Sequence, residues 1–489
     1  MAYFSYKPIL TDDYFAGKPL DIGHGPQVVG SDIIIEDTYR LELCQEYAKK
    51  FDGDAPIRPI GLPWEREMGR NSVEYDEEEG IYKTWYYTGG NADRSFRRQS
   101  SPVIGNMHIC VGYLESKDGI NWVRPELPEF TFAHYMKTNI VFGECEIGRI
   151  ARNVDKTDPE KKYIFVYNAD CGICLAYSRD GRHWVKDDEH NPVTCVQSDC
   201  SIQFGYDEGR KVWMIFERPD LYAKNEDLPG DGDWWNANYR RRVSVRESYD
   251  LIHWTPARIA HHSPESAFFT EADNLSFFTV GDYPMAFINK FRPYDLRYQH
   301  QVSFIATGRD AYHLKTPFPD DPTLDRGGYD DPDGSLAIID SQGLDLFGDG
   351  RVYFYYRRFA FRDTGRNGAD LGLVSYEKDR FLAQVGDIDG GWLLTREFIL
   401  DGSSIEVNAN IAKIGILTAE ILEGCGKCDR TMTPIPGFTA GECDGIKGDT
   451  LSSKLTWNGS SDISSLRGRS VYIRFYVKFG RFYTFTVNE

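Results

Sequence analysis

Long apolar runs and helical periodicity are both missing from this sequence of 489 residues. No segment approaches the roughly 18–20 consecutive apolar residues that a membrane-spanning helix requires, which argues against a protein that crosses or binds a membrane. Amphipathic helical periodicity of useful length is also absent, which argues against the helical fold classes. The first residues lack the basic-then-apolar layout of a secretory signal, so we predict a cytoplasmic protein.

Positive charge is scarce as well. The 56 lysine and arginine residues face 75 aspartate and glutamate residues, which gives a formal net charge of −19 at pH 7. A field of this sign repels nucleic acids and anionic membrane surfaces. We therefore predict neither as a partner, although a local basic pocket is compatible with the overall charge.

Cysteine is present, but its spacing is not that of a metal site. The ten cysteines include two Cys-x-x-Cys pairs, Cys171/Cys174 and Cys425/Cys428. The pairs lie about 250 residues apart, whereas a zinc site takes four ligands with metal-type spacing. We predict free thiols, no metal ligands and no cofactor, while a carboxylate-rich channel could hold a structural cation such as calcium.

Aromatic residues and a repeated phrase are what the sequence has in abundance. Aromatic residues make up 14% of the chain, which favours strands over helices. A phrase of the form Ser-x-Asp-x-x-x-Trp starts at Ser116, Ser178 and Ser248, and fainter copies start at Gly308 and Ser375. The copies are about 60 to 70 residues apart, and self-similarity at a fixed period is typical of repeat architectures.

Each period contains four short runs of β-branched and aromatic residues bounded by Gly, Asp, Asn and Pro, which is typical of strands and turns. In the second period these runs are 150–155, 163–168, 172–177 and 183–186. Four-stranded antiparallel units repeated radially form a β-propeller. The five periods therefore predict an all-β protein with a five-bladed β-propeller. In each blade an Asp-Gly type of turn joins the third and fourth strands, and the Trp after it packs between blades.

The texture of the sequence divides the chain into three parts. We predict the propeller, as the catalytic domain, over residues 61–395. From about Phe398 the strand pattern changes, which predicts a separate C-terminal β-sandwich over residues 396–489. Strand-like runs within residues 1–60 are predicted to brace the propeller or the sandwich.

Candidate catalytic residues follow from propeller geometry, because inner strands begin on the face where second strands end. Charged residues at these positions converge on a central funnel. Glycoside hydrolysis uses two carboxyl groups, one protonated acid and one base or nucleophile, about 5–9.5 Å apart, and crowding of like charges separates their pKa values. We predict Glu217 as the acid, because it ends an apolar run that would desolvate it, and Asp199 as the base, with Glu271 and Asp273 as competitors.

Residues predicted to bind the substrate come from the same strand ends and from one Trp-containing loop. Guanidinium groups suit carboxylate, sulfate or phosphate, so the arginines point either to an anionic sugar or to a role in orienting the carboxylates. Exposed aromatic rings suit stacking on sugars, although the loop could equally pack against the sandwich. The predicted binding residues are Trp64, Glu65, Arg70, Asn71, Arg152, Asp170, Arg218, Trp235, Arg292, Asp331 and Arg357.

Several phrases resemble those of a known family. Pro63-Trp64-Glu65, the run from Tyr75 to Tyr87 and the run from Leu466 to Phe475 are similar to phrases of poorly characterised bacterial proteins grouped with the invertase, inulinase and levanase glycosidases. Arabinanases and β-xylosidases share the propeller. The resemblance implies a five-bladed propeller, a C-terminal β-sandwich and glycosidase activity.

The catalytic motifs of that family match only in part. The Asn-Asp-Pro-Asn-Gly run that carries the invertase nucleophile is missing from the first period, and its nearest counterpart is Asp330-Asp-Pro-Asp-Gly334 in the last. The run Glu217-Arg-Pro-Asp220 is similar to the family's Glu-Cys-Pro-Asp acid motif. Fructan specificity and a retaining mechanism are therefore not implied by the resemblance.

These features together predict a carbohydrate-metabolising glycoside hydrolase. It would cleave a furanoside or an unusual or anionic glycoside by paired-carboxylate chemistry in the funnel, with an oligosaccharide or glycoside as substrate. A transglycosylase or phosphorylase on the same scaffold is the alternative among enzymes. A non-catalytic carbohydrate-binding propeller is the alternative from another class.

Overall fold

The computed structural model of the chain describes residues 4–489 apart from 53–54, 66–67, 90–109, 133–134, 144, 146, 170, 196–201, 219–222, 225–238, 262–268, 270, 292–299, 329, 361–368 and 425–431. Within these residues the secondary structure is almost entirely strand, and the helical segments are α1 (Asp12–Phe15), η2 (Pro159–Lys161) and η3 (Ser464–Leu466). The predicted all-β class is confirmed. Among the described residues, no helix has both the length and the apolar character needed to cross a membrane.

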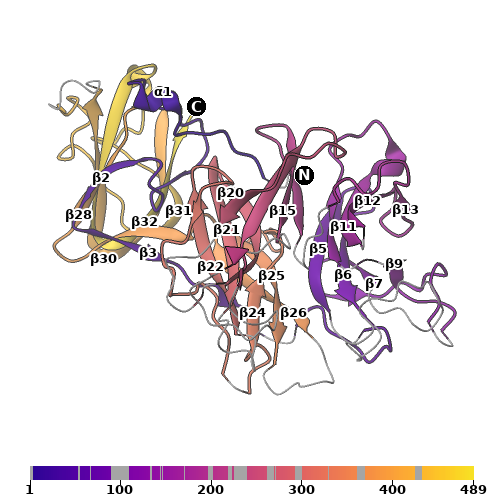
Figure 1. Cartoon of the computed structure of the whole chain (residues 1–489). Coiled ribbons are helices and arrows are strands. Elements are labelled where there is room, and N and C mark those ends of the chain that lie inside the picture. The colour runs from indigo at the N-terminus through magenta and orange to yellow at the C-terminus, as the bar shows by residue number, and fades with distance from the viewer. Residues whose placement is uncertain are drawn as a thin grey trace.

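Five antiparallel units of four paired strands follow one another along the chain (Figure 1). The first unit is β5 (Gly69–Asp76), β6 (Ile81–Thr88), β7 (Cys110–Ser116) and β8 (Trp122–Val123), with β9 (Ile140–Gly143) added beside β7. The second is β10 (Ile147–Arg152), β11 (Tyr163–Ala169), β12 (Gly172–Ser178) and β13 (Val185–Lys186). The third is β14 (Gln203–Asp207), β15 (Val212–Glu217), β18 (Val243–Ser248) and β19 (Arg258–His261). The fourth is β20 (Glu271–Val280), β21 (Tyr283–Phe291), β22 (Gln301–Gly308) and β23 (Leu314–Lys315), and the fifth is β24 (Leu336–Ile339), β25 (Arg351–Phe359), β26 (Asp370–Glu377) and β4 (Lys49–Lys50).

Contacts between strands link the five units one after another and back to the first. β5 packs against β10, β10 against β14, and β14 against β20. The fourth and fifth units are joined by a short parallel pairing of β22 with β24, and the carbonyl of Ile339 accepts hydrogen bonds from Ser276 and Asn289. β25 packs against β5 and closes the ring. Radial repetition of four-stranded units is typical of a β-propeller, and the five-bladed propeller stays the prediction that these pairings support.

The fifth blade is completed by a strand from far away in the sequence. β4 pairs with β26 through Lys49 opposite Ser375 and Lys50 opposite Val374. The strands that follow β26 in the chain, β27 (Leu382–Gly386) and β28 (Gly391–Thr395), pair with the C-terminal strand β32 (Ser470–Asn488). The residues between 382 and 395 thus belong to the C-terminal sheet, and an N-terminal strand fills the place next to β26.

A second body of nine strands stands where the β-sandwich is predicted. Its two long strands, β30 (Ser404–Glu423) and β32, pair along most of their length (Figure 1). The remaining strands are β1 (Gln27–Val28), β2 (Ile35–Tyr39), β3 (Leu41–Gln45), β27, β28, β29 (Phe398–Ile399) and β31 (Gly448–Lys454). The N-terminal segment therefore pairs with both bodies, with β1 to β3 in this sheet and β4 in the propeller.

One apolar core joins the two bodies. Phe287 and Phe354 of the propeller lie in the same buried cluster as Val407 and Phe482 of the C-terminal sheet. Tyr14 of the N-terminal segment belongs to this cluster too. Burial of such large side chains stabilises a fold by about 1.5–3 kcal/mol each, so the shared core holds the propeller and the C-terminal sheet together.

The repeated Ser-x-Asp phrase has a structural role, as predicted. In the first copy, Ser116 Oγ accepts the Gly119 N–H at 2.9 Å, and Asp118 Oδ1 accepts the N–H groups of Ile120 and Asn121 at 2.9 and 2.8 Å. Side-chain oxygens that accept nearby N–H groups close such turns. Trp122, which follows the turn, donates from Nε1 to the Tyr355 hydroxyl of the fifth blade at 3.2 Å. The phrase thus forms a turn within a blade and a contact between blades.

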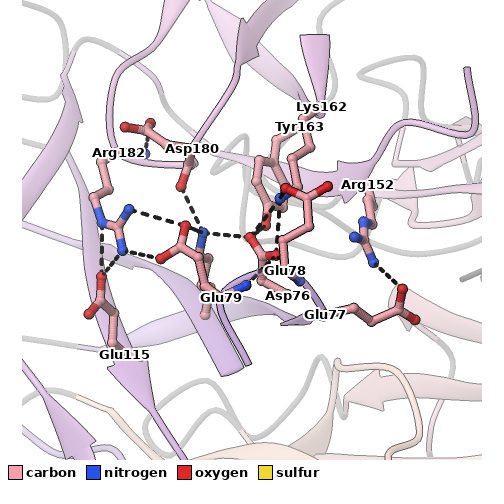
Figure 2. A network of polar contacts seen from close by, with 12 residues as sticks. Asp76, Glu77, Glu78, Glu79, Glu115, Arg152, Lys162, Tyr163, Asp180 and Arg182 are labelled. Atoms are coloured by element: carbon pink, nitrogen blue, oxygen red, sulfur yellow. Dashed lines mark hydrogen bonds and ion pairs between the residues drawn. The ribbon is translucent and has the colours of Figure 1, made fainter. Parts of the chain in front are cut away.

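The second copy also anchors a buried polar network between the first two blades, shown in Figure 2. Lys83 of β6 is fully buried and donates to Asp76 at 2.7 Å, to Glu79 at 2.6 Å and to the carbonyl of Asp180 at 3.0 Å. Asp76 also accepts from Tyr163 of β11 at 2.7 Å. The network lies at the ends of β5 and β10 that point away from the predicted funnel. It therefore joins the blades without taking part in the site.

Candidate active site

Two β-bulges turn side chains from non-adjacent blades toward each other at the ring axis. In β5 the register shifts between Gly69 and Asn71, and in β20 it shifts between Ala272 and Asn274, so Arg70 and Asp273 are the extra residues. Arg70 has a φ of 40°, in the left-handed region that a non-glycine residue rarely adopts. Its Nη2 lies 3.6 Å from Asp273 Oδ2. Bulges commonly re-aim side chains beside active sites, and these two join the first and fourth blades.

Asp273 is surrounded by arginines. Arg218, which directly follows β15, is in contact with Asp273 Oδ1, and Arg241 Nη1 lies 3.6 Å from the same oxygen. Burial alone would raise the pKa of Asp273, but the charges of Arg218, Arg70, Arg241 and Arg357 lower it below its ordinary value. Asp273 is therefore an ionised carboxylate in a buried position.

A second buried carboxyl group, Asp340, lies in the same cluster with the opposite shift. It follows the last residue of β24 and is 1% exposed. Burial raises the pKa of Asp340, although Arg149, Arg357 and Arg70 act against the rise. The two buried carboxyl groups of the cluster therefore have pKa values that are shifted in opposite directions.

Arg149 connects three blades beside Asp340. From β10 it donates to the carbonyl of Asn71 in the first blade and to the carbonyl of Asp340 in the fifth. Beside it is a cavity of about 10 Å³ that Asn71, Ser72, Gln203 and others line, which is room for about one water molecule. The axis is therefore closed beneath the site by polar groups.

The other predicted catalytic residues are placed differently from one another. Glu271 is buried near the start of β20, and its Oε2 accepts the Arg241 N–H at 2.6 Å, so it lies close to the Asp273 cluster. Glu217 is fully buried at the end of β15 and accepts from Arg246 Nε at 2.6 Å. Asp199 lies outside the described residues.

Among the predicted binding residues, Arg70, Arg218 and Arg357 meet at the axis, and Asn71 is buried directly beside them. Asp170, Trp235 and Arg292 lie outside the described part of the chain. Arg152 is at the opposite end of β10, where its Nη1 lies 3.8 Å from Glu77 (Figure 2). Asp331 is exposed, and its carboxylate accepts the Gly328 N–H at 2.6 Å within a turn.

Trp64 and Glu65 form a buried polar cluster beside the funnel wall. Trp64 Nε1 donates to Asn139 Oδ1 at 2.8 Å. Glu65 accepts from the Tyr86 hydroxyl at 2.5 Å and from Arg124 Nε at 2.8 Å. Both residues are at most 3% exposed, so in this structure they fix the segment before β5 rather than face the funnel.

Within the described ranges, no three His, Cys, Asp or Glu side chains form a group that could hold a metal ion. The carboxyl groups of Asp273 and Asp340 lie among arginines, and the structural cation suggested by the sequence stays a prediction. Cys171 and Cys174 are free thiols whose sulfurs lie 3.6 Å apart, and Cys425 and Cys428 lie outside the described residues.

Sequence reasoning missed Asp340, Arg149 and Arg241 as members of the site. None of the three is among the site residues predicted from the sequence. A signal for Asp340 exists, because it is the acidic end of the apolar run Leu336-Ala-Ile-Ile-Asp340. Arg241 lies two residues before β18, the third strand of its blade, and no sequence pattern marks it.

Comparison with known proteins finds similarity at the level of solved structures. No family model and no curated protein matches the sequence. A glycosyl hydrolase from Bacteroides ovatus is similar with 16% identity, 69% of this chain and 95% of that chain covered, and a TM-score of 0.45. A β-1,2-mannobiose phosphorylase from Listeria innocua has 12% identity, coverage of 68% and 96%, and a TM-score of 0.42. A fructofuranosidase from Schwanniomyces occidentalis has 11% identity, coverage of 90% and 100%, and a TM-score of 0.42.

The three solved structures are described as a glycosyl hydrolase, a phosphorylase and a fructofuranosidase. Similarity of this degree identifies neither a substrate nor a reaction. The function of this chain has to be sought in its own residues.

Proposed function

We propose that the chain is a glycoside hydrolase that cleaves a furanoside or an anionic glycoside at the axis of the propeller, with Asp273 as the ionised member of an acid/base pair. The observation that carries the proposal is the pair of bulges that bring Arg70 and Asp273 together from non-adjacent blades. A strained backbone and a buried charge both cost stability. Such costs are common at sites whose geometry serves chemistry.

Asp273 has the properties of the base or nucleophile. It is ionised although buried, because several arginines lower its pKa, and it is held from several sides. Glycosidases stabilise a positively charged, oxocarbenium-like transition state, which an adjacent carboxylate favours. The arginines hold the carboxylate in one orientation, as a positioned group requires.

The second carboxyl group comes from Glu271 or Glu217. Glu271 is the closer candidate, because its Oε2 accepts the N–H of Arg241, whose guanidinium group also lies near Asp273. Glu217 stands in the neighbouring blade beside Arg246. In either case the donor would protonate the leaving oxygen while Asp273 acts from the other side. Hydrolysis of this kind uses no redox cofactor.

The experiment compares Asp273→Asn, Glu271→Gln and Glu217→Gln on a panel of natural and aryl glycosides. The variant that lacks the proton donor should lose natural substrates but keep aryl glycosides with acidic leaving groups, because those need no protonation. Asp273→Asn should lose both. Glu160→Gln is the matched control, since it changes an exposed carboxylate that belongs to no predicted site. Wild-type protein that hydrolyses nothing in the panel would refute the proposal.

A phosphorylase is the second candidate, favoured by the same guanidinium groups, since they suit phosphate as well as carboxylate. Turnover that requires inorganic phosphate and yields a sugar phosphate would assign this reaction instead. A carbohydrate-binding propeller without turnover would keep sugar binding in all three amide variants and show no product in the wild type. The cytoplasmic location and the absence of nucleic-acid and membrane partners stay predictions from the sequence.

A further inference from the structure

A buried carboxyl group with no hydrogen-bond partner for its oxygens in the described ranges lies in the cluster around Asp273. Asp340 is 1% exposed, and neither of its carboxyl oxygens has a hydrogen-bond partner among the described residues. Its main-chain carbonyl, in contrast, accepts from Arg149. Buried polar side chains are nearly always hydrogen-bonded in native proteins. The two carboxyl oxygens of Asp340 therefore need a physical explanation.

The charges around Asp340 come from four other strands or strand ends. Arg149 lies on β10, Arg357 on β25, Arg70 on β5 and Asp273 on β20, and all four act on Asp340 electrostatically. The buried Nε of Arg357 also has no hydrogen-bond partner within the described residues. The cluster thus contains an N–H donor that an oxyanion could accept from, and an acid whose carboxyl oxygens have no hydrogen-bond partner in the described part of the chain.

We propose that the arginine cluster around Asp273 is the subsite for the anionic group of a sugar acid, and that Asp340 takes up the proton that accompanies its binding. A neutral Asp340 leaves the guanidinium charge to the ligand, whereas an ionised Asp340 competes with the ligand for the same charge. The inference rests on the proposed function, because it names the substrate class for the same funnel. It requires no covalent step, only the transfer of one proton from solvent to a carboxylate oxygen.

The coupling has a defined sign. A bound anion is a further negative charge beside Asp340, and a like charge raises the pKa of a carboxyl group. Burial already raises the pKa of Asp340 in the absence of ligand. Binding therefore draws a proton from solution when the pH lies between the pKa values of the free and the bound state. By reciprocity the affinity for the anion falls as pH rises through that interval.

The experiment is calorimetric titration with D-glucuronate and with sulfate as probes, and with D-glucose as the neutral control. It is run from about pH 5 to about pH 8 in buffers of different ionisation heat, which reports the protons taken up. The affinity for both anions should fall by up to about tenfold per pH unit over the coupled interval, as one linked proton requires. Glucose should show no such fall.

Variants assign the effect to Asp340. Asp340→Asn should bind the anions with an affinity that does not depend on pH, because asparagine resembles the neutral acid in shape and charge. Asp282→Asn is the matched control, since Asp282 is another carboxyl group with a raised pKa, at the turn between β20 and β21. It should keep the pH dependence. If Asp340→Asn does not fold, Arg357→Gln should weaken anion binding at least tenfold, and proton uptake by the wild type is measured without any variant.

Three results would overturn the inference. They are anions that bind no better than glucose, anion binding without proton uptake, and a pH dependence that persists in Asp340→Asn. Failure here is separable from failure of the proposed function, because binding is measured without turnover. A chain that hydrolyses neutral glycosides but binds no anion keeps the function and loses the subsite. A chain that binds sugar acids with proton uptake but hydrolyses nothing confirms the subsite and refutes the proposed function.

Discussion

Replacing Lys83 by methionine should destabilise the propeller strongly, because Lys83 is a fully buried cation between two blades. The change removes donors to Asp76, Glu79 and the carbonyl of Asp180. Removing one partner of a buried ion pair costs about 3–5 kcal/mol, because the other charge is left uncompensated. Asp76 keeps Lys162 at 2.9 Å, so we expect a cost near the lower end, about 3 kcal/mol.

Urea unfolding followed by tryptophan fluorescence measures this cost, and a double-mutant cycle isolates the pair. The double variant Lys83→Met, Asp76→Asn should be more stable than the sum of the single changes by about 1–3 kcal/mol, since neither charge is then left alone. The control is Arg179→Gln, whose ion pair with Glu160 is about 70% exposed on both sides. That pair should contribute at most about 1 kcal/mol. A cost for Lys83→Met no larger than the control would refute the reasoning.

Three further changes probe the turns, the funnel and the axis. Asp118→Ala removes the acceptor of two main-chain N–H groups and should lower the free energy of unfolding by about 1–2 kcal/mol in urea; a loss below about 0.3 kcal/mol would contradict the assigned turn role. Arg218→Gln removes the largest of the charges that lower the pKa of Asp273, so the acid limb of kcat/KM should move to higher pH, and an unmoved limb would count against Asp273 as the base. Asp340 has a raised pKa in the folded chain, so the folded state binds more protons than the unfolded state and stability falls as pH rises from the ordinary aspartate value through the raised one. Asp340→Asn should lack this fall in stability. An unchanged pH dependence of unfolding in the variant would disprove the assignment of the fall to Asp340.

The fold could be predicted because its signals are local and repeated. The Ser-x-Asp phrase marks a turn in each of the first three blades, and short strands separated by turn residues supply the rest. The pairing of β4 with β26, which completes the fifth blade, could not be predicted from such local signals. β4 contains only Lys49 and Lys50, which have no strand-like pattern, and their place beside β26 is decided by tertiary packing.

The site could be predicted only in part, for a different physical reason. Arg70, Arg218 and Asp273 came into consideration because they lie at strand ends that face the predicted funnel. Which side chains then face the funnel depends on the alternation along each strand. A bulge breaks that alternation, and no residue pattern marks the bulges at Arg70 and Asp273. Trp64 is close in sequence to the strand end that is predicted to face the funnel, but its indole N–H donates to Asn139. Asn139 lies 75 residues further along the chain, so the sequence around Trp64 does not reveal this contact.

The most direct test of the central proposal is turnover by the wild type and by Asp273→Asn, measured on the same panel of furanosides, uronosides and aryl glycosides. We predict that the wild type releases sugar from at least one member and that Asp273→Asn loses at least about 10³-fold of that rate, since the variant lacks one of the two essential carboxyl groups. Sugar binding and the unfolding transition of the variant should be retained. Turnover in Asp273→Asn equal to that of the wild type would contradict the proposal that the carboxylate held by the arginines at the propeller axis performs the reaction.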